Sequence, residues 1–118
     1  MDDEDASVRV ALSENYLAWR QNFSAAAAEA LKATELAYFN PKAHYLLGTS
    51  LQRLGKIDAS LNALKLAISQ NPVFPEAHRR LAFVYAKHLG DAEKAAQHKQ
   101  LARQARQRIN QVKRQRGF

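Results

Sequence analysis

The chain has 118 residues, no cysteine and a formal net charge of +7 at pH 7. This length fits one domain, and a hydrophobic content of 47% is enough for a packed core, so composition excludes a fully disordered chain. The lack of cysteine excludes a disulfide scaffold, a thiolate zinc site and a cysteine nucleophile. No apolar run approaches the roughly 18 residues of a membrane span, and the first residues are acidic, so we expect a cytoplasmic protein without an export signal.

Positive charge is concentrated at one end of the chain. Residues 1–93 contain ten Lys and Arg against eleven Asp and Glu, whereas residues 94–118 contain eight Lys and Arg and no acidic residue. The net charge therefore describes a C-terminal segment rather than the whole fold. We expect an acidic, disordered start over 1–5, a folded domain over 6–109 and a basic extension over 110–118.

Apolar residues recur at helical spacing between proline and glycine residues that end or begin helices. Over 57–70, for example, Ile57, Leu61, Leu64 and Ile68 follow one another at intervals of three or four. Each stretch is too long for a typical strand, and alanine is abundant, which favours helix. In chain order the pattern predicts six helices, over 7–20, 23–38, 41–54, 57–70, 75–88 and 91–115.

The chain repeats itself at an interval of 34 residues. With this shift, the segment from Pro41 to His44 aligns with the segment from Pro75 to His78, and Gly48 aligns with Ala82. The first and third units each contain one extra residue, before Phe23 and before Gly90. A period of 34 with two helices in each unit is typical of a stacked helical array, in which no unit buries its apolar face alone.

The repeats resemble the tetratricopeptide repeat. In the middle unit the resemblance is carried by Leu47, Gly48, Leu64, Ala67 and Pro72. The third unit matches through Leu81, Ala82, Tyr85, Ala95 and Ala102, and the first through Leu12, Ser13, Tyr16, Ala26 and Ala33. The resemblance implies an all-α, right-handed superhelical solenoid of about three helix hairpins, over 6–40, 41–74 and 75–109, with a long C-terminal capping helix.

The resemblance also implies a non-catalytic protein–protein interaction module, a scaffold or adaptor, whose concave groove holds a peptide or protein segment. Groove positions of the family fall on Lys42, Tyr45, Thr49, Gln52, Arg53, Glu76, Arg79, Phe83 and Lys87, with Arg80 beside them. Cations flanking aromatic rings fit a partner with acidic and apolar side chains. In the alternative interpretation, the rings pack on neighbouring helices and the charges form a solvated face.

The sequence leaves open whether the chain stands alone. It is either a self-standing adaptor or a regulatory or positioning module excised from a larger multidomain protein such as an enzyme. Association of exposed array ends into a homodimer is a further alternative. The family's clamp for chaperone C-terminal tails is disfavoured, since of its five positions only Arg80 agrees.

The basic segment has its own candidate residues, Lys99, Arg103, Arg106, Arg108, Lys113, Arg114 and Arg116. A capping helix with a wetted outer face is the simplest interpretation. Contact with nucleic-acid phosphates, with an acidic protein or with a membrane surface remains an alternative, and nucleic acid is not favoured because stacking aromatic residues are missing.

No pattern of nucleophile, acid–base pair, phosphate loop or metal ligands is present, so we expect no catalytic residue, no metal site and no cofactor. His44 and His78 occupy the same repeat position and are expected to be packing residues. Tyr16 and Trp19 are expected to pack against the second helix of the first unit.

Overall fold

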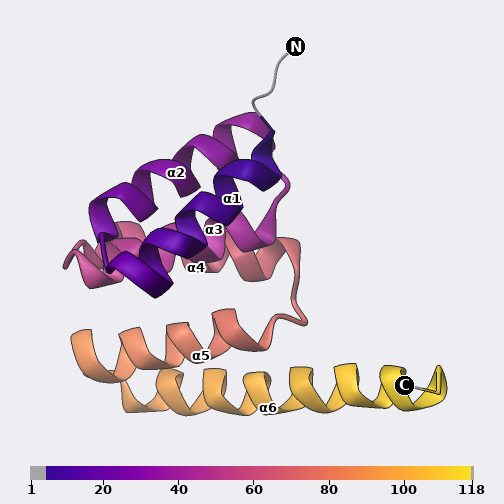
Figure 1. Cartoon of the computed structure of the whole chain (residues 1–118). Coiled ribbons are helices and arrows are strands. Elements are labelled where there is room, and N and C mark those ends of the chain that lie inside the picture. The colour runs from indigo at the N-terminus through magenta and orange to yellow at the C-terminus, as the bar shows by residue number, and fades with distance from the viewer. Residues whose placement is uncertain (1–4, 118) are drawn as a thin grey trace.

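The structure is a computed structural model that describes residues 5–117, and its regular elements are all helical (Figure 1). The helices are α1 Ala6–Asn15, the π-helical turn η1 Tyr16–Arg20, α2 Phe23–Leu36, α3 Pro41–Arg53, α4 Ile57–Gln70, α5 Pro75–Phe83, the π-helical turn η2 Val84–His88 and α6 Ala92–Gln115. They form three successive hairpins, α1–α2, α3–α4 and α5–α6, in which α2 packs on α3 and α4 packs on α5. The predicted helical solenoid is confirmed.

Capping residues set the helix bounds that the sequence predicts. The N–H of Ala43 donates to the Asn40 side chain at 3.2 Å at the start of α3, and the N–H of Lys94 donates to Asp91 at 3.0 Å at the start of α6. Gly55 ends the turn after α3 with a φ of 81°, which a residue without a Cβ adopts at no cost.

The sequence predicts a boundary near each end of the chain, after residue 5 and before residue 110. Residues 1–4 of the expected disordered start lie outside the described residues, and Asp5 caps α1 by accepting from the N–H of Ser7 at 2.8 Å. At the other end, α6 runs unbroken from Ala92 to Gln115 and extends past the start of α5 (Figure 1). The backbone therefore does not change at residue 110, where the basic extension was expected to begin.

The extra residue in the first and third units is absorbed by π-helical turns. Both units leave the α-helical pattern near the end of their first helix, at Tyr16–Arg20 and Val84–His88, whereas α3 of the middle unit has no such turn. A π-turn accommodates one added residue within a helix. Because the insertion is taken up there, the second helices of all three units keep their register.

The two helices of each hairpin approach closely at small residues. A Cβ built on Gly48 of α3 would lie 2.6 Å from Cγ of Leu64 on α4. Beside it, the Ser60 hydroxyl donates to the Gly48 carbonyl at 2.6 Å, and in the first hairpin the Ser13 hydroxyl donates to the Ala26 carbonyl at 2.8 Å. The small residue that the repeat pattern predicts is thus required by the helix crossing.

Two apolar clusters hold the hairpins together. The first consists of Val10, Ala30, Ala33, Ala43 and Leu46, and the second of Leu64, Leu81, Val84, Tyr85 and Ala95. The half-buried ring of Tyr45 packs against both clusters. It therefore connects the core of the first two hairpins to that of the third.

The two equivalent histidines hold the loops that join the hairpins. His44 is 3% exposed and its Nε2 lies 2.9 Å from the Tyr38 carbonyl, while His78 is 4% exposed and its Nε2 lies 3.0 Å from the Pro72 carbonyl. Because a carbonyl only accepts, each Nε2 carries the proton and donates. Both residues have the packing role that their repeat position indicates.

The prediction that Trp19 packs against α2 is wrong, since its side chain is 82% exposed, whereas Tyr16 is half-buried. Trp19 stands where the third unit has His88, which contacts Gln52 of the preceding unit at 3.1 Å. This repeat position therefore contacts the preceding unit. Among the described residues no unit precedes α1, and Trp19 is exposed.

Adding a methyl group at the crossing tests the close approach of α3 and α4. We expect Gly48→Ala to destabilise the protein by about 1–3 kcal/mol, because Leu64 is fully buried and has no room to move, and overpacking outweighs the higher helix propensity of alanine. Urea unfolding followed by circular dichroism measures the change. In a Leu64→Ala background the same substitution should cost nothing or stabilise; an equal cost in both backgrounds would contradict the packing argument.

A second prediction concerns pH and the α5–α6 hairpin. The ring of His98 on α6 stacks on Tyr85 with centroids 5.5 Å apart, and its Nδ1 lies 3.2 Å from Nδ1 of His78. Burial, and then the charges of His78, Lys65 and Lys94, lower the pKa of His98 below its usual value of about 6.5.

On acidification His98 is protonated at a higher pH in the unfolded chain than in the folded protein. Its contribution to the free energy of unfolding is therefore fully present above about pH 6.5 and is lost as the pH falls through the lower pKa of the folded state. Denaturant unfolding at a series of pH values should therefore show a loss on acidification that is smaller in His98→Phe, which keeps the ring on Tyr85. Identical pH profiles for the two proteins would rule out this role of His98.

Candidate functional site

One hollow lies between the first helices of the second and third hairpins. It has a volume of about 390 Å³ and is lined by Tyr45 of α3 and by Glu76, Arg79, Arg80 and Phe83 of α5. We call these five residues the groove. Four of them were predicted from their repeat positions, and Arg80 was predicted as a neighbour of those positions, so the structure brings half of the ten predicted groove residues together.

The other predicted groove residues lie elsewhere or are already engaged. Thr49 and Gln52 are buried, at 7% exposure each, and the Gln52 amide contacts Nε2 of His88 at 3.1 Å and Nη1 of Arg80 at 3.4 Å. Gln52 thus joins α3 to the third hairpin and does not face solvent.

Three exposed cations predicted for the groove have partners within the array. Lys42 pairs with Glu14 at 2.8 Å. Arg53 lies over the ring of Phe23, 4.4 Å from its centroid, and Lys87 lies 5.5 Å from the centroid of Phe83. Of these three cations, Lys87 alone lies beside the groove, because the ring that it contacts, Phe83, is part of the groove lining.

The groove itself has a mixed electrostatic character. Its acid, Glu76, pairs with Arg106 of α6 at 3.2 Å, and the guanidinium of Arg80 lies 5.8 Å from the centroid of Phe83. Among the described residues Arg79 has no ion-pair partner. The groove therefore presents net positive charge next to the faces of Tyr45 and Phe83, which is suited to carboxylates attached to apolar side chains.

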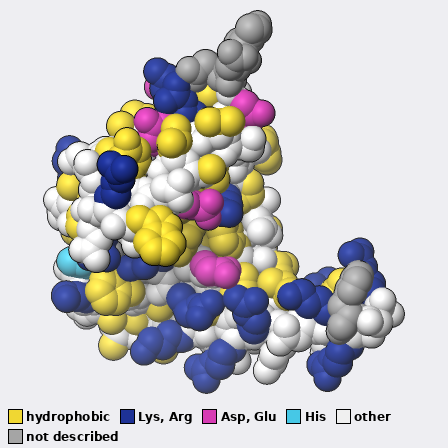
Figure 2. Space-filling model, in the orientation of Figure 1, with side chains coloured by type: hydrophobic (Ala, Val, Ile, Leu, Met, Phe, Trp, Pro, Cys, Tyr) yellow, Lys and Arg dark blue, Asp and Glu magenta, His cyan; other side chains and the backbone are white. Residues whose placement is uncertain are grey.

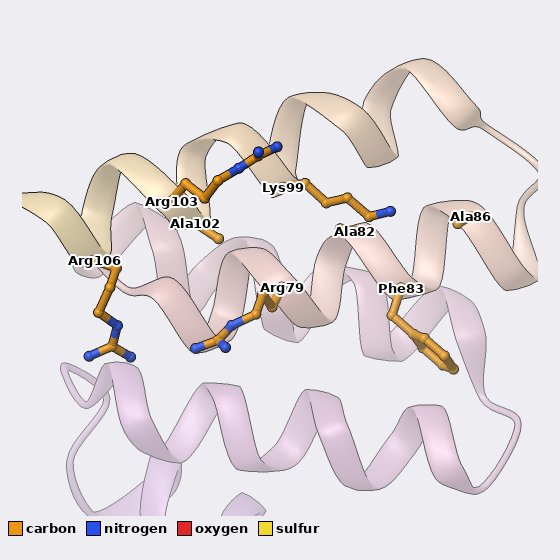
Figure 3. A pocket seen from close by; sticks show the side chains of 8 residues that line it. All are labelled: Arg79, Ala82, Phe83, Ala86, Lys99, Ala102, Arg103 and Arg106. Atoms are coloured by element: carbon orange, nitrogen blue, oxygen red, sulfur yellow. The ribbon is translucent and has the colours of Figure 1, made fainter.

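A second and larger surface lies between α5 and α6. A cavity of about 680 Å³ is lined there by Arg79, Ala82, Phe83, Ala86, Lys99, Ala102, Arg103 and Arg106. We call these residues the shelf. Its floor is alanine from both helices, and the long cationic side chains stand around it, as Figure 3 shows. Arg79 and Phe83 belong to both surfaces, so the groove and the shelf are adjacent.

The structure divides the predicted basic residues into two sets. Lys99, Arg103 and Arg106 line the shelf, whereas Arg108, Lys113, Arg114 and Arg116 are exposed farther along α6 and just after it. Figure 2 shows the Lys and Arg side chains gathered over α5 and α6 along the lower part of the view. The positive segment is thus partly a lining of a cavity and partly a solvated helix surface.

Sequence reasoning missed the floor of the shelf. Ala82 and Ala102 were identified only as residues of the repeat pattern, and Ala86 only as one of the family's groove positions. A signal was present: Lys99 stands one repeat after the fully buried Leu64, at a shift of 35. A cation at an otherwise apolar stacking position marks a surface that does not receive another apolar helix.

Within residues 5–117, no group of three or more His, Cys, Asp or Glu side chains could hold a metal ion. None of the helices formed by these residues has the length and apolarity needed to cross a bilayer. The described residues form two hollow surfaces made of aromatic rings, alanine and cations.

No protein-family profile and no curated protein matches the sequence. Solved structures of MamA do match. MamA MSR-1 aligns with a TM-score of 0.76 at 25% sequence identity, over 90% of this chain and 60% of that chain. Another crystal structure of MamA gives 0.79 at 22% identity over 93% and 63%, and MamA AMB-1 gives 0.72 at 27% identity over 86% and 54%.

These matches place the chain in a tetratricopeptide-like helical solenoid fold. The chain spans about 60% of the length of the MamA MSR-1 chain. The similarity therefore concerns a series of repeats and not the whole of that protein.

Proposed function

We propose that this chain is a non-catalytic adaptor that binds a peptide or protein segment in the groove, through carboxylates and apolar side chains of the partner. The observation that carries the proposal is the meeting of Tyr45, from one hairpin, with Arg79, Arg80 and Phe83, from the next, around one hollow. Residues 30 or more positions apart in the chain form this surface only when the hairpins stack.

The chemistry of the groove sets the kind of partner. The guanidinium group of Arg80 is held beside Gln52 and Phe83, so little side-chain freedom remains to be lost when it binds a carboxylate. Phe83 is 39% exposed, and burying its ring and that of Tyr45 supplies apolar contact. A segment that alternates acidic with aliphatic or aromatic side chains satisfies both features.

A peptide library displayed on phage and selected against the wild-type protein tests the groove. We expect enriched peptides to combine Asp or Glu with aliphatic or aromatic residues, and to bind Arg80→Gln about tenfold more weakly, because a charged hydrogen bond is lost. Fluorescence anisotropy with synthetic versions of the peptides gives the dissociation constants.

The matched control is Lys65→Gln, which removes one exposed positive charge from α4 outside the lining of the groove. This variant should bind the peptides within about twofold of the wild type. Peptides that bind Arg80→Gln as tightly as the wild type, or enrichment of basic peptides, would contradict the proposal.

A further inference from the structure

The shelf is the surface on which a further unit of the array would stack. In the middle unit, Tyr45, Leu64 and Ile68 pack in the cluster that receives Leu81 and Val84 of the third unit. One repeat later, at shifts of 34 and 35, the residues in the same places are Arg79, Lys99 and Arg103. All three line the shelf. The shelf thus corresponds to the surface of the middle unit that packs against the next unit, with its large apolar residues replaced by cations.

The small residues between the paired helices are kept. Gly48 and Ala67 of the middle unit correspond to Ala82 and Ala102, which are 2% and 5% exposed at the floor of the shelf. As at Gly48, small side chains let the two helices of a hairpin lie close together, here α5 and α6. The hollow between the paired helices is therefore kept in the third unit, while the large residues around it have changed from apolar to cationic.

The cations of the shelf are available to a partner. Arg106 makes an exposed pair with Glu76 at 3.2 Å, and among the described residues Arg79, Lys99 and Arg103 have no ion-pair partner. Like charges gathered around an apolar floor repel one another, and carboxylates placed between them relieve that repulsion. From this complementarity we propose that the shelf binds an acidic amphipathic α-helix of a partner protein, in the position of a fourth unit's first helix.

A second copy of this chain fits the shelf less well. Its α1 and η1 expose Val8 at 51% and Trp19 at 82%. Residues 6–20 carry Arg9, which pairs with Glu29, and Arg20, against the single acid Glu14, which pairs with Lys42. The acidic residues at that end precede the helix. Nucleic acid would leave the alanine floor without an apolar contact, so an acidic helix is the better match.

Two synthetic helical peptides of about 18 residues test the proposal, a length at which a helix rich in alanine is populated in water. Both carry the same stripe of Leu and Ala at helical spacing; one is flanked by Glu and the other by Lys. We expect the wild type to bind the Glu-flanked peptide at least about tenfold more tightly in fluorescence anisotropy. Amide NMR shifts on binding should map to Ala82, Ala86 and Ala102.

Variants on the same helix separate the shelf from general attraction by the basic segment. Lys99→Glu with Arg103→Glu should weaken binding of the Glu-flanked peptide at least about tenfold, whereas Arg108→Glu with Lys113→Glu makes the same charge change outside the shelf and should leave it within about threefold. All four positions are exposed, and circular dichroism melting checks that both variants fold. Arg80→Gln, which alters the groove alone, should leave this binding unchanged, so failure of the groove and failure of the shelf are distinguishable.

Several results would overturn the proposal. Equal weakening in the two double variants would mean nonspecific attraction along α6, and equal affinity for the Glu-flanked and Lys-flanked peptides would remove the role of charge. A dimer in light scattering that is lost only in Lys99→Glu with Arg103→Glu would make a second copy the occupant. Binding of single-stranded RNA, and not of the Glu-flanked peptide, by the wild type would assign the surface to nucleic acid.

Discussion

The contact between Gly48 and Leu64 is the constraint on which the array depends. A single added carbon atom at Gly48 would lie 2.6 Å from the Leu64 side chain, and the Ser60 hydroxyl bonds to the Gly48 carbonyl in the same place. Because α3 and α4 approach so closely at this point, the faces left for neighbours are the outer faces of the hairpin. Those outer faces are what the next hairpin contacts.

The stacking of the hairpins creates the groove, and the open side of the last hairpin forms the shelf. The third hairpin meets the second mainly through α4, and Gln52 with His88 forms a polar link beside the apolar cluster. Between α3 and α5, the ring of Tyr45 and the cations of α5 border a hollow. At the open side of the last hairpin no further unit covers Ala82 and Ala102 within the described residues, and the shelf results.

The packing of the helices decides the surroundings of each positively charged side chain. The net charge of +7 comes from a segment that the sequence presents as one basic run. In three dimensions Lys99 and Arg103 join Arg79, from a different helix, around an alanine floor, while Arg108 and Lys113 point to solvent farther along α6. Cations of one segment therefore have two environments, the lining of the shelf and the solvated surface of the helix beyond it.

The sequence by itself determined the helices, their pairing and the places of close approach. Apolar spacing, the prolines and glycines at helix ends and the small residue of each repeat act locally, so Pro41, Gly48 and the extra residue before Gly90 could be interpreted without coordinates. Only the tertiary structure decided that Gln52 is buried, that Trp19 is exposed and that alanine forms the floor of a cavity. These properties depend on which faces of separate hairpins meet, and the packing of neighbours is not encoded in the spacing along one helix.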